Sequence, residues 1–195
     1  MNTVRPIQQH AEMRCCLLFS LLLTFGWGPA AHATEVPRLA GNVVGVPDGD
    51  TVDVLLESGM VRVRLHAVDA PEHDQPHGNA SRRELSRLVY RRAVELEPIE
   101  QDQYDRLVAR LWVGDMDVNA ELLKRGAAWV YRRYAHEAAY CAYEKSARDL
   151  GRGVWRLPGV QRLAPWEWRH RDKRRKPFTD YSDQSLAECV ASLGK

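Results

Sequence analysis

Three short β-branched runs between tight turns constrain the fold of this chain more than any other feature. The runs cover residues 42–46, 51–56 and 61–65, and the last one alternates strictly between apolar and basic side chains. The segments 47–50 and 57–60 separate them and are rich in the Gly, Pro, Asp and Ser residues that favour turns. The pattern predicts a meander of three antiparallel strands.

The rest of the central region mixes helical and strand-like patterns. Leu85, Leu88 and Val89 recur at helical spacing within residues 79–89. Further along, we expect strands at residues 93–97 and 107–113 and helices at residues 119–125 and 136–150, each helix ending at a glycine. Five strands with an intervening helix predict an α+β, mostly β fold built on a small closed barrel.

Composition sets the broad class of the chain. Its 195 residues are enough for one ordinary domain, and 45% hydrophobic with 28% charged residues excludes disorder, coiled coil and collagen. The 28 basic and 26 acidic residues nearly cancel, so the distribution of charge is more informative than its sum.

The first 33 residues have the pattern of a secretory signal peptide. Arg5 and Arg14 precede an apolar run over residues 15–27, and Ala31-His32-Ala33 has the small-x-small form of a cleavage site. An uncleaved membrane anchor is the alternative, but the run is shorter than the ~20 residues that span a bilayer. We expect cleavage after Ala33 and an exported protein, periplasmic or secreted.

Two cysteines remain in the exported chain, Cys141 and Cys189. An oxidising compartment permits a disulfide between them, and two free thiols are the alternative that the sequence leaves open.

Acidic residues gather where the strands of the meander end. Asp48 and Asp50 flank a glycine in the first turn, and Asp69 and Glu72 follow the third strand, which carries Arg64. If the strands pair as predicted, these side chains crowd one end of the barrel. Carboxylates repel one another unless a cation neutralises them, and oxygen ligands favour Ca²⁺ or Mg²⁺. The pattern predicts a divalent metal site.

Two arginines complete a set suited to phosphodiester hydrolysis. Arg64 and Arg106 could hold phosphate oxygens and stabilise the charge of the transition state, because a guanidinium binds phosphate bidentately. Glu72 is then available as a base for the attacking water.

The order of these motifs resembles the staphylococcal nuclease (thermonuclease) family over about residues 41–155. The matching pieces are Asp48-Gly49-Asp50-Thr51, Val63-Arg64-Leu65 with Val68-Asp69-Ala70-Pro71-Glu72, Asp102-Gln103-Tyr104-Asp105-Arg106, and Val118-Asn119 followed by Gly126-Ala127-Ala128-Trp129. The resemblance implies a five-stranded OB-fold barrel with about three helices. It also implies a Ca²⁺-dependent nuclease that cuts DNA and RNA with little sequence preference and leaves 3′-phosphate ends.

The resemblance also assigns roles by position. Asp50, Asp69 and the main-chain carbonyl of Ala70 become calcium ligands, and Asp48 supports the water shell of the cation. Glu72 becomes the general base, and Arg64 and Arg106 become the residues that hold the phosphate.

Two tyrosines match family positions that contact the nucleotide. Tyr104 is expected along the nucleotide and Tyr134 on a base, whereas packing against the fold is the alternative for each. Asp105 departs from the glycine that is usual before the second arginine. A glycine there would permit a positive φ that Asp only tolerates, and the carboxylate of Asp105 could pair with Arg106 and draw it off the phosphate.

The chain thus divides into residues 1–33, a nuclease domain over residues 34–155, and an extension over residues 156–195 whose fold the sequence leaves open. Within residues 169–176 the extension carries a run of six basic residues, Arg169, Arg171, Lys173, Arg174, Arg175 and Lys176. Such a run is either an ordinary solvated segment or an additional attraction for phosphates.

Three functions compete at this level. The first is an exported monomeric nuclease, free of the membrane after cleavage, that acts on DNA and RNA with single strands favoured. The second is a non-catalytic OB-fold module that only binds nucleic acid. The third is an envelope protein that uses the barrel to bind a protein partner.

Overall fold

The predicted meander and the two later strands form one sheet that closes on itself. Its strand order is β3-β2-β1-β5-β6-β7, and β3 also pairs with β6, which closes the barrel. The strands are β1 (Leu39–Asp48), β2 (Thr51–Leu56), β3 (Gly59–Leu65), β5 (Ala93–Gln101), β6 (Leu107–Val113) and the two-residue β7 (Met116–Asp117). The five expected strands and the closed barrel are confirmed, and β7 is an addition.

This computed structural model describes Met1, residues 37–173 and residues 178–195, without the side chain of residue 173. The chain divides into Met1–Thr34 and Glu35–Lys195, and only the second unit is described below. Apart from Met1, the predicted signal peptide lies outside the described residues. Within residues 37–173 and 178–195, none of the helices is long and apolar enough to cross a bilayer.

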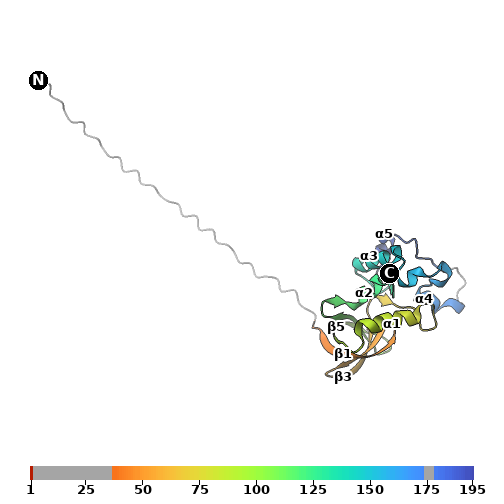
Figure 1. The fold of residues 1–195 in the computed structure, drawn as a ribbon, viewed down its shortest axis with the longest axis horizontal. Coiled ribbons are helices and arrows are strands. Elements are labelled where there is room, and N and C mark those ends of the chain that lie inside the picture. The colour runs from red at the N-terminus through yellow and green to blue at the C-terminus, as the bar shows by residue number, and fades with distance from the viewer. Residues whose placement is uncertain (2–36, 174–177) are drawn as a thin grey trace. The chain divides into compact units, whose positions relative to one another are not determined.

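Helices and one small extra sheet complete the fold (Figure 1). The expected helices are α1 (Gly78–Val89), α2 (Val118–Lys124) and α3 (Ala138–Asp149). The one-turn segment η1 (Gly153–Arg156) ends the nuclease domain, and the extension adds α4 (Pro165–Trp168), α5 (Leu186–Ala191) and the short segments η2 (Gly159–Gln161) and η3 (Arg171–Lys173). The pair β4 (Val68–Asp69) and β8 (Trp129–Val130) forms a second, antiparallel sheet that the sequence pattern did not predict.

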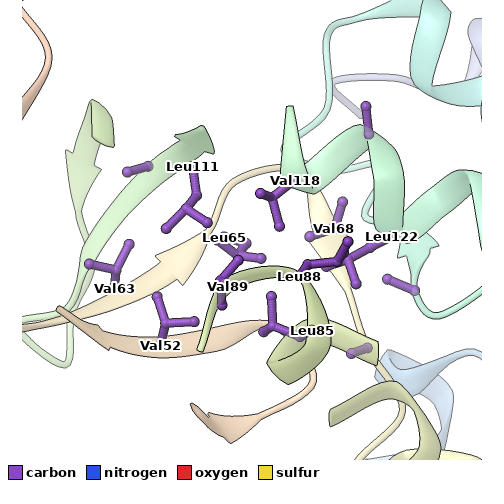
Figure 2. Close-up of a cluster of buried hydrophobic side chains, with 14 of the residues drawn as sticks. Val52, Val63, Leu65, Val68, Leu85, Leu88, Val89, Leu111, Val118 and Leu122 are labelled. Atoms are coloured by element: carbon purple, nitrogen blue, oxygen red, sulfur yellow. The ribbon is translucent and has the colours of Figure 1, made fainter. Parts of the chain in front are cut away.

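The core lies inside the barrel and under α1. Val52 and Val63 of adjacent strands and Leu65 are buried, as are Leu85 and Val89 of α1, and Figure 2 shows these side chains gathered together. The strict alternation of β3 produces this arrangement, since period-2 side chains put its apolar residues inside and its arginines outside. Each fully buried aliphatic side chain contributes about 1.5–3 kcal/mol.

A second apolar cluster ties the extension to α3. Trp129, Trp155 and Ala164 are buried together, with Trp166 and Tyr181 packed against them. Cys141 of α3 and Cys189 of α5 form a disulfide, and α3 and α5 lie side by side in Figure 1. Of the two alternatives for these cysteines, a disulfide or two free thiols, the structure contains the disulfide.

Candidate active site

The glycine between the two turn aspartates lets the β1–β2 turn approach the segment after β4. A Cβ at Gly49 would lie only 2.7 Å from the Cβ of Ala70, so a larger residue does not fit. The close approach lets the backbone N–H of Ala70 donate a hydrogen bond of 2.9 Å to Asp50 Oδ2. The turn and the exit of β4 therefore form one unit.

Arg64 bridges the two buried carboxylates of this unit. Its Nη1 lies 2.6 Å from Asp50 Oδ1, and its Nη2 lies 2.8 Å from Asp69 Oδ1. Asp50 and Asp69 are 3% and 0% exposed, so their charges need cationic partners, and Arg64 contacts both of them. Burial alone would lower the pKa of Arg64, but the two carboxylates outweigh burial and raise it. Arg64 is therefore a permanent cation at this point.

Asp48 lies at the same end of the barrel and has a raised pKa. Burial is the main cause, and the nearby charge of Asp50 adds to it, while the hydrogen bond from the backbone N–H of Gly49 opposes both. The smaller contributions of Asp50 and Glu72 reflect like charges of neighbouring carboxylates. This is the electrostatic environment in which a cation is stabilised.

Glu72 follows β4 in a loop held against the start of α1. The Glu72 N–H donates to Gln75 Oε1 at 3.1 Å, and the backbone of Gly78 packs so closely that a Cβ there would lie 1.9 Å from the carbonyl oxygen of Glu72. The Glu72 side chain remains partly exposed and faces the same cleft as Asp48 and Arg64.

Arg106 stands at the end of a tight loop that leads into β6. The loop is organised by Asp102, whose Oδ1 accepts hydrogen bonds from the N–H groups of Tyr104 and Arg106. Asp105 has a φ of 58°, which is the left-handed region that a glycine in this place would permit. The guanidinium pairs with Asp102 at 2.7 Å instead of with Asp105. Although burial opposes it, hydrogen bonding to Arg106 lowers the pKa of Asp102.

The predicted tyrosines line the same cleft, which encloses about 840 Å³. Tyr104 is 70% exposed and Tyr134 is 39% exposed, so neither side chain is buried in the core. The guanidinium of Arg106 lies 5.5 Å from the ring centroid of Tyr104, and Tyr134 packs edge-on against Tyr131. Exposed aromatic faces beside arginines are suited to binding nucleotide bases.

One residue that lies in the site was not predicted from the sequence. Arg169, from the extension, forms ion pairs with Asp69 at 2.7 Å and with Glu72 at 2.6 Å. The basic run that begins at Arg169 was the available signal, but its pairing with residues about a hundred positions earlier was not predictable. At this residue, the expectation of an ordinary solvated segment is wrong. Residues 174–177 of the run lie outside the described part of the chain.

The donors present fit a hard divalent cation bound by few protein ligands. Across the described residues, no three His, Cys, Asp or Glu side chains are grouped so as to hold a metal ion. The predicted site needs only two carboxylates and one main-chain carbonyl, with water and phosphate oxygens completing the shell. Asp50 and Asp69 already converge on one cationic group, the guanidinium of Arg64.

Comparisons with known proteins agree with this geometry. The model of the family described as staphylococcal nuclease homologue matches residues 62–157. A Haemophilus influenzae protein named uncharacterized endonuclease is 34% identical over 169 residues, which cover 86% of this chain and 92% of that protein. The chain belongs to the staphylococcal nuclease family.

Other relatives of this nuclease-family chain point the same way. A Shigella flexneri protein named micrococcal nuclease is 37% identical, over 68% of this chain and 82% of its own length. A rice protein named probable staphylococcal-like nuclease CAN1 is 33% identical over 66% of this chain but only 38% of its own length. Family membership places this chain among the nucleases that hydrolyse phosphodiester bonds, on an OB-fold barrel.

Proposed function

We propose that this chain is an exported, Ca²⁺-dependent nuclease that cuts DNA and RNA with little sequence preference and leaves 3′-phosphate ends. The observation that carries the proposal is the convergence of Asp50 and Asp69 on Arg64 within one cleft that also contains Glu72 and Arg106. The names of the bacterial relatives, which include endonuclease, support internal cleavage of the chain.

Calcium is assigned to the carboxylates that are already preorganised. Asp50 and Asp69, with the carbonyl of Ala70, would hold the cation, and Asp48 would support its water shell. When bound, the cation supplies positive charge that neutralises the carboxylates and polarises a phosphate oxygen. With so few protein ligands, its dissociation constant is expected to be of order 10⁻⁴–10⁻³ M.

Glu72 and the two arginines carry the remaining chemistry. Glu72 accepts a proton from the water whose oxygen bonds to phosphorus, and the 5′ P–O bond breaks. The products are a 3′-phosphate and a 5′-hydroxyl, whose oxygen takes up a proton from solvent water. Arg64 and Arg106 bind the phosphate oxygens, whose negative charge increases in the transition state. Within the described part of the chain, Asp102 accepts hydrogen bonds from Nε and Nη2 of Arg106. This leaves Nη1 of Arg106 available for a phosphate oxygen.

The surface of the cleft accounts for the low preference for base sequence in the nucleic acid. Tyr104 and Tyr134 offer ring faces, and stacking accepts any base at about 1–3 kcal/mol per base. Single strands fit such a surface better than duplexes because their bases are free to stack. DNA and RNA are both expected substrates.

Export rests on two independent features. The N-terminal 33 residues have the pattern of a signal peptide, and the Cys141–Cys189 disulfide suits an oxidising compartment. We expect a periplasmic or secreted monomer without stable membrane association after cleavage.

The test uses mature protein, residues 34–195, and single-stranded DNA and RNA. Release of acid-soluble nucleotides is measured with Ca²⁺ and with a calcium chelator, for wild type and for Asp50→Ala and Arg64→Ala. Arg62→Ala is the matched control, since Arg62 lies on the same strand but is exposed and paired with Asp53. The proposal expects cleavage only with Ca²⁺, lost in the two site variants and kept in the control.

Two other results would favour the competing functions. Binding of nucleic acid without cleavage in either condition would support the non-catalytic OB-fold module. Absence of binding even at low salt would support a protein-binding role. Product ends are read by terminal transferase, which should extend the products only after a phosphatase has removed the 3′-phosphate.

A further inference from the structure

The C-terminal extension contributes an arginine of its own to the active-site cleft. Arg169 Nη2 donates to Asp69 Oδ2 at 2.7 Å, and its Nη1 lies 3.1 Å from Asp69 Oδ1 and 2.6 Å from Glu72 Oε1. One guanidinium therefore joins a buried carboxylate to the carboxylate proposed as the general base. Such charge-assisted, bidentate contacts are the strong and directional ones.

The segment that carries Arg169 is docked firmly beside the cleft. Trp166, three residues earlier, stacks on Tyr131 with an interplanar angle of 3° and packs edge-on against Trp129. Arg169 itself is 34% exposed at its side chain and lines the cleft with Arg64 and Arg106. The position of Arg169 is thus set by packing, not by its ion pairs alone.

The same segment also braces the loop that carries Glu72. Gln75 Nε2 donates to the carbonyl oxygen of Leu163 at 2.7 Å, and Trp168 Nε1 donates to Asp74 Oδ1 at 3.0 Å. Together with the Arg169–Glu72 pair, these contacts connect three positions of the loop 72–75 to the extension. The extension is structurally continuous with the site.

The Glu72 carboxylate depends on this arrangement. Among the described residues, Arg169 is the one side chain that donates a hydrogen bond to that carboxylate. A flexible glutamate would otherwise sample several rotamers in an open cleft. A proton acceptor misplaced by about 1 Å can slow a reaction by a factor of about 10².

We propose that Arg169 is a positioning residue of the nuclease site, which holds Glu72 in the cleft and makes the C-terminal extension part of the active site. The inference rests on the proposed function and deepens it. It assigns to the extension a task that the resemblance, which ends near residue 155, does not include.

The test compares Arg169→Ala and Arg169→Lys with wild type, under saturating Ca²⁺ and over a range of single-stranded DNA concentrations. The Ala variant should lose about 10–100-fold in kcat with little change in KM, because the residue acts through Glu72 rather than by binding substrate. The Lys variant should recover part of the loss, and millimolar guanidinium should partly restore the Ala variant.

Controls separate positioning from folding and from loss of charge. Arg162→Ala removes another arginine of the extension, one that faces Asp180 at 3.8 Å and does not line the cleft, and it should keep the wild-type kcat. Combining Arg169→Ala with Glu72→Gln should cost little more than Glu72→Gln alone, because both changes disable the same group. Thermal unfolding confirms that each variant is folded.

Four results would overturn the inference. Arg169→Ala could keep the wild-type kcat, or the fall in kcat caused by Arg169→Ala could add in full to the fall caused by Glu72→Gln in the double variant. A variant that is faster than wild type and binds Ca²⁺ more tightly by calorimetry would show that Arg169 blocks the site instead. A wild type that does not cut nucleic acid would overturn the proposed function first and the inference with it.

Discussion

Asp50 accepts a hydrogen bond of 2.9 Å from the backbone N–H of Ala70, twenty positions later in the chain. This bond joins the turn after β1 to the segment after β4 and thereby brings two groups of acidic residues together. Arg64 pairs with both Asp50 and Asp69, and Arg169 also pairs with Asp69, so two guanidinium groups balance the two buried carboxylates within the folded chain. A preorganised cluster binds a cation without refolding.

Calcium should therefore stabilise the folded protein. For a dissociation constant of order 10⁻⁴–10⁻³ M, about 10 mM Ca²⁺ should raise the free energy of unfolding by about 1.4–2.7 kcal/mol. Urea unfolding with and without Ca²⁺ measures the change. Asp50→Asn should abolish the increase, and Asp53→Asn, an acidic residue of β2 paired with exposed Arg62, should leave it intact. Equal stabilisation of both variants would contradict the assigned site.

The Cys141–Cys189 disulfide should contribute substantially to stability. It closes a loop over 48 positions, and removal of such a constraint typically costs about 2–4 kcal/mol. Urea unfolding with and without dithiothreitol tests this. The double variant Cys141→Ala/Cys189→Ala should match the reduced wild type and should not respond to the reductant. Identical midpoints for oxidised and reduced wild type would contradict the prediction.

His66 should make stability depend on pH. Burial, aided by the positive charge of Arg110, lowers its pKa. The unfolded chain therefore binds this proton more tightly than the folded protein does, and the free energy of unfolding falls as the pH drops below about 6.5. One such histidine changes stability by at most about 1.4 kcal/mol per pH unit.

The measurement is urea unfolding at about pH 7.5 and about pH 5.5. His66→Gln should lose less stability between the two values than wild type does. His73→Gln, which changes an exposed histidine, serves as the control. A wild-type slope that persists unchanged in His66→Gln would show that other groups cause the pH dependence.

The barrel was predictable because its strands and helices have periodic sequence patterns. Very short strands, and contacts between residues far apart in the sequence, were not predictable. The alternation of β3 and the helical spacing of Leu85, Leu88 and Val89 reflect which side chains are buried, so the elements follow from the sequence. The two-residue strands β4 and β8 are too short to carry a period. Their pairing, Val68 with Val130, depends on the tertiary fold.

The candidate site shows the same division. Asp48, Asp50, Arg64 and Glu72 were placed together because adjacent strands and turns carry them. Arg169 was not, because its contacts with Asp69 and Glu72 span 100 and 97 positions. The extension is held by packing of Trp166 and by the disulfide, and neither is a local property of its own sequence.

The most direct test of the central claim is the effect of Glu72→Gln on turnover and on binding. A general base contributes about 10²–10⁴-fold, and Gln keeps the size of Glu but cannot accept the proton. The account predicts that kcat on single-stranded DNA with Ca²⁺ falls by orders of magnitude while the affinity for DNA stays close to that of wild type. An unchanged kcat would contradict the role of Glu72 and, with it, this account of the site.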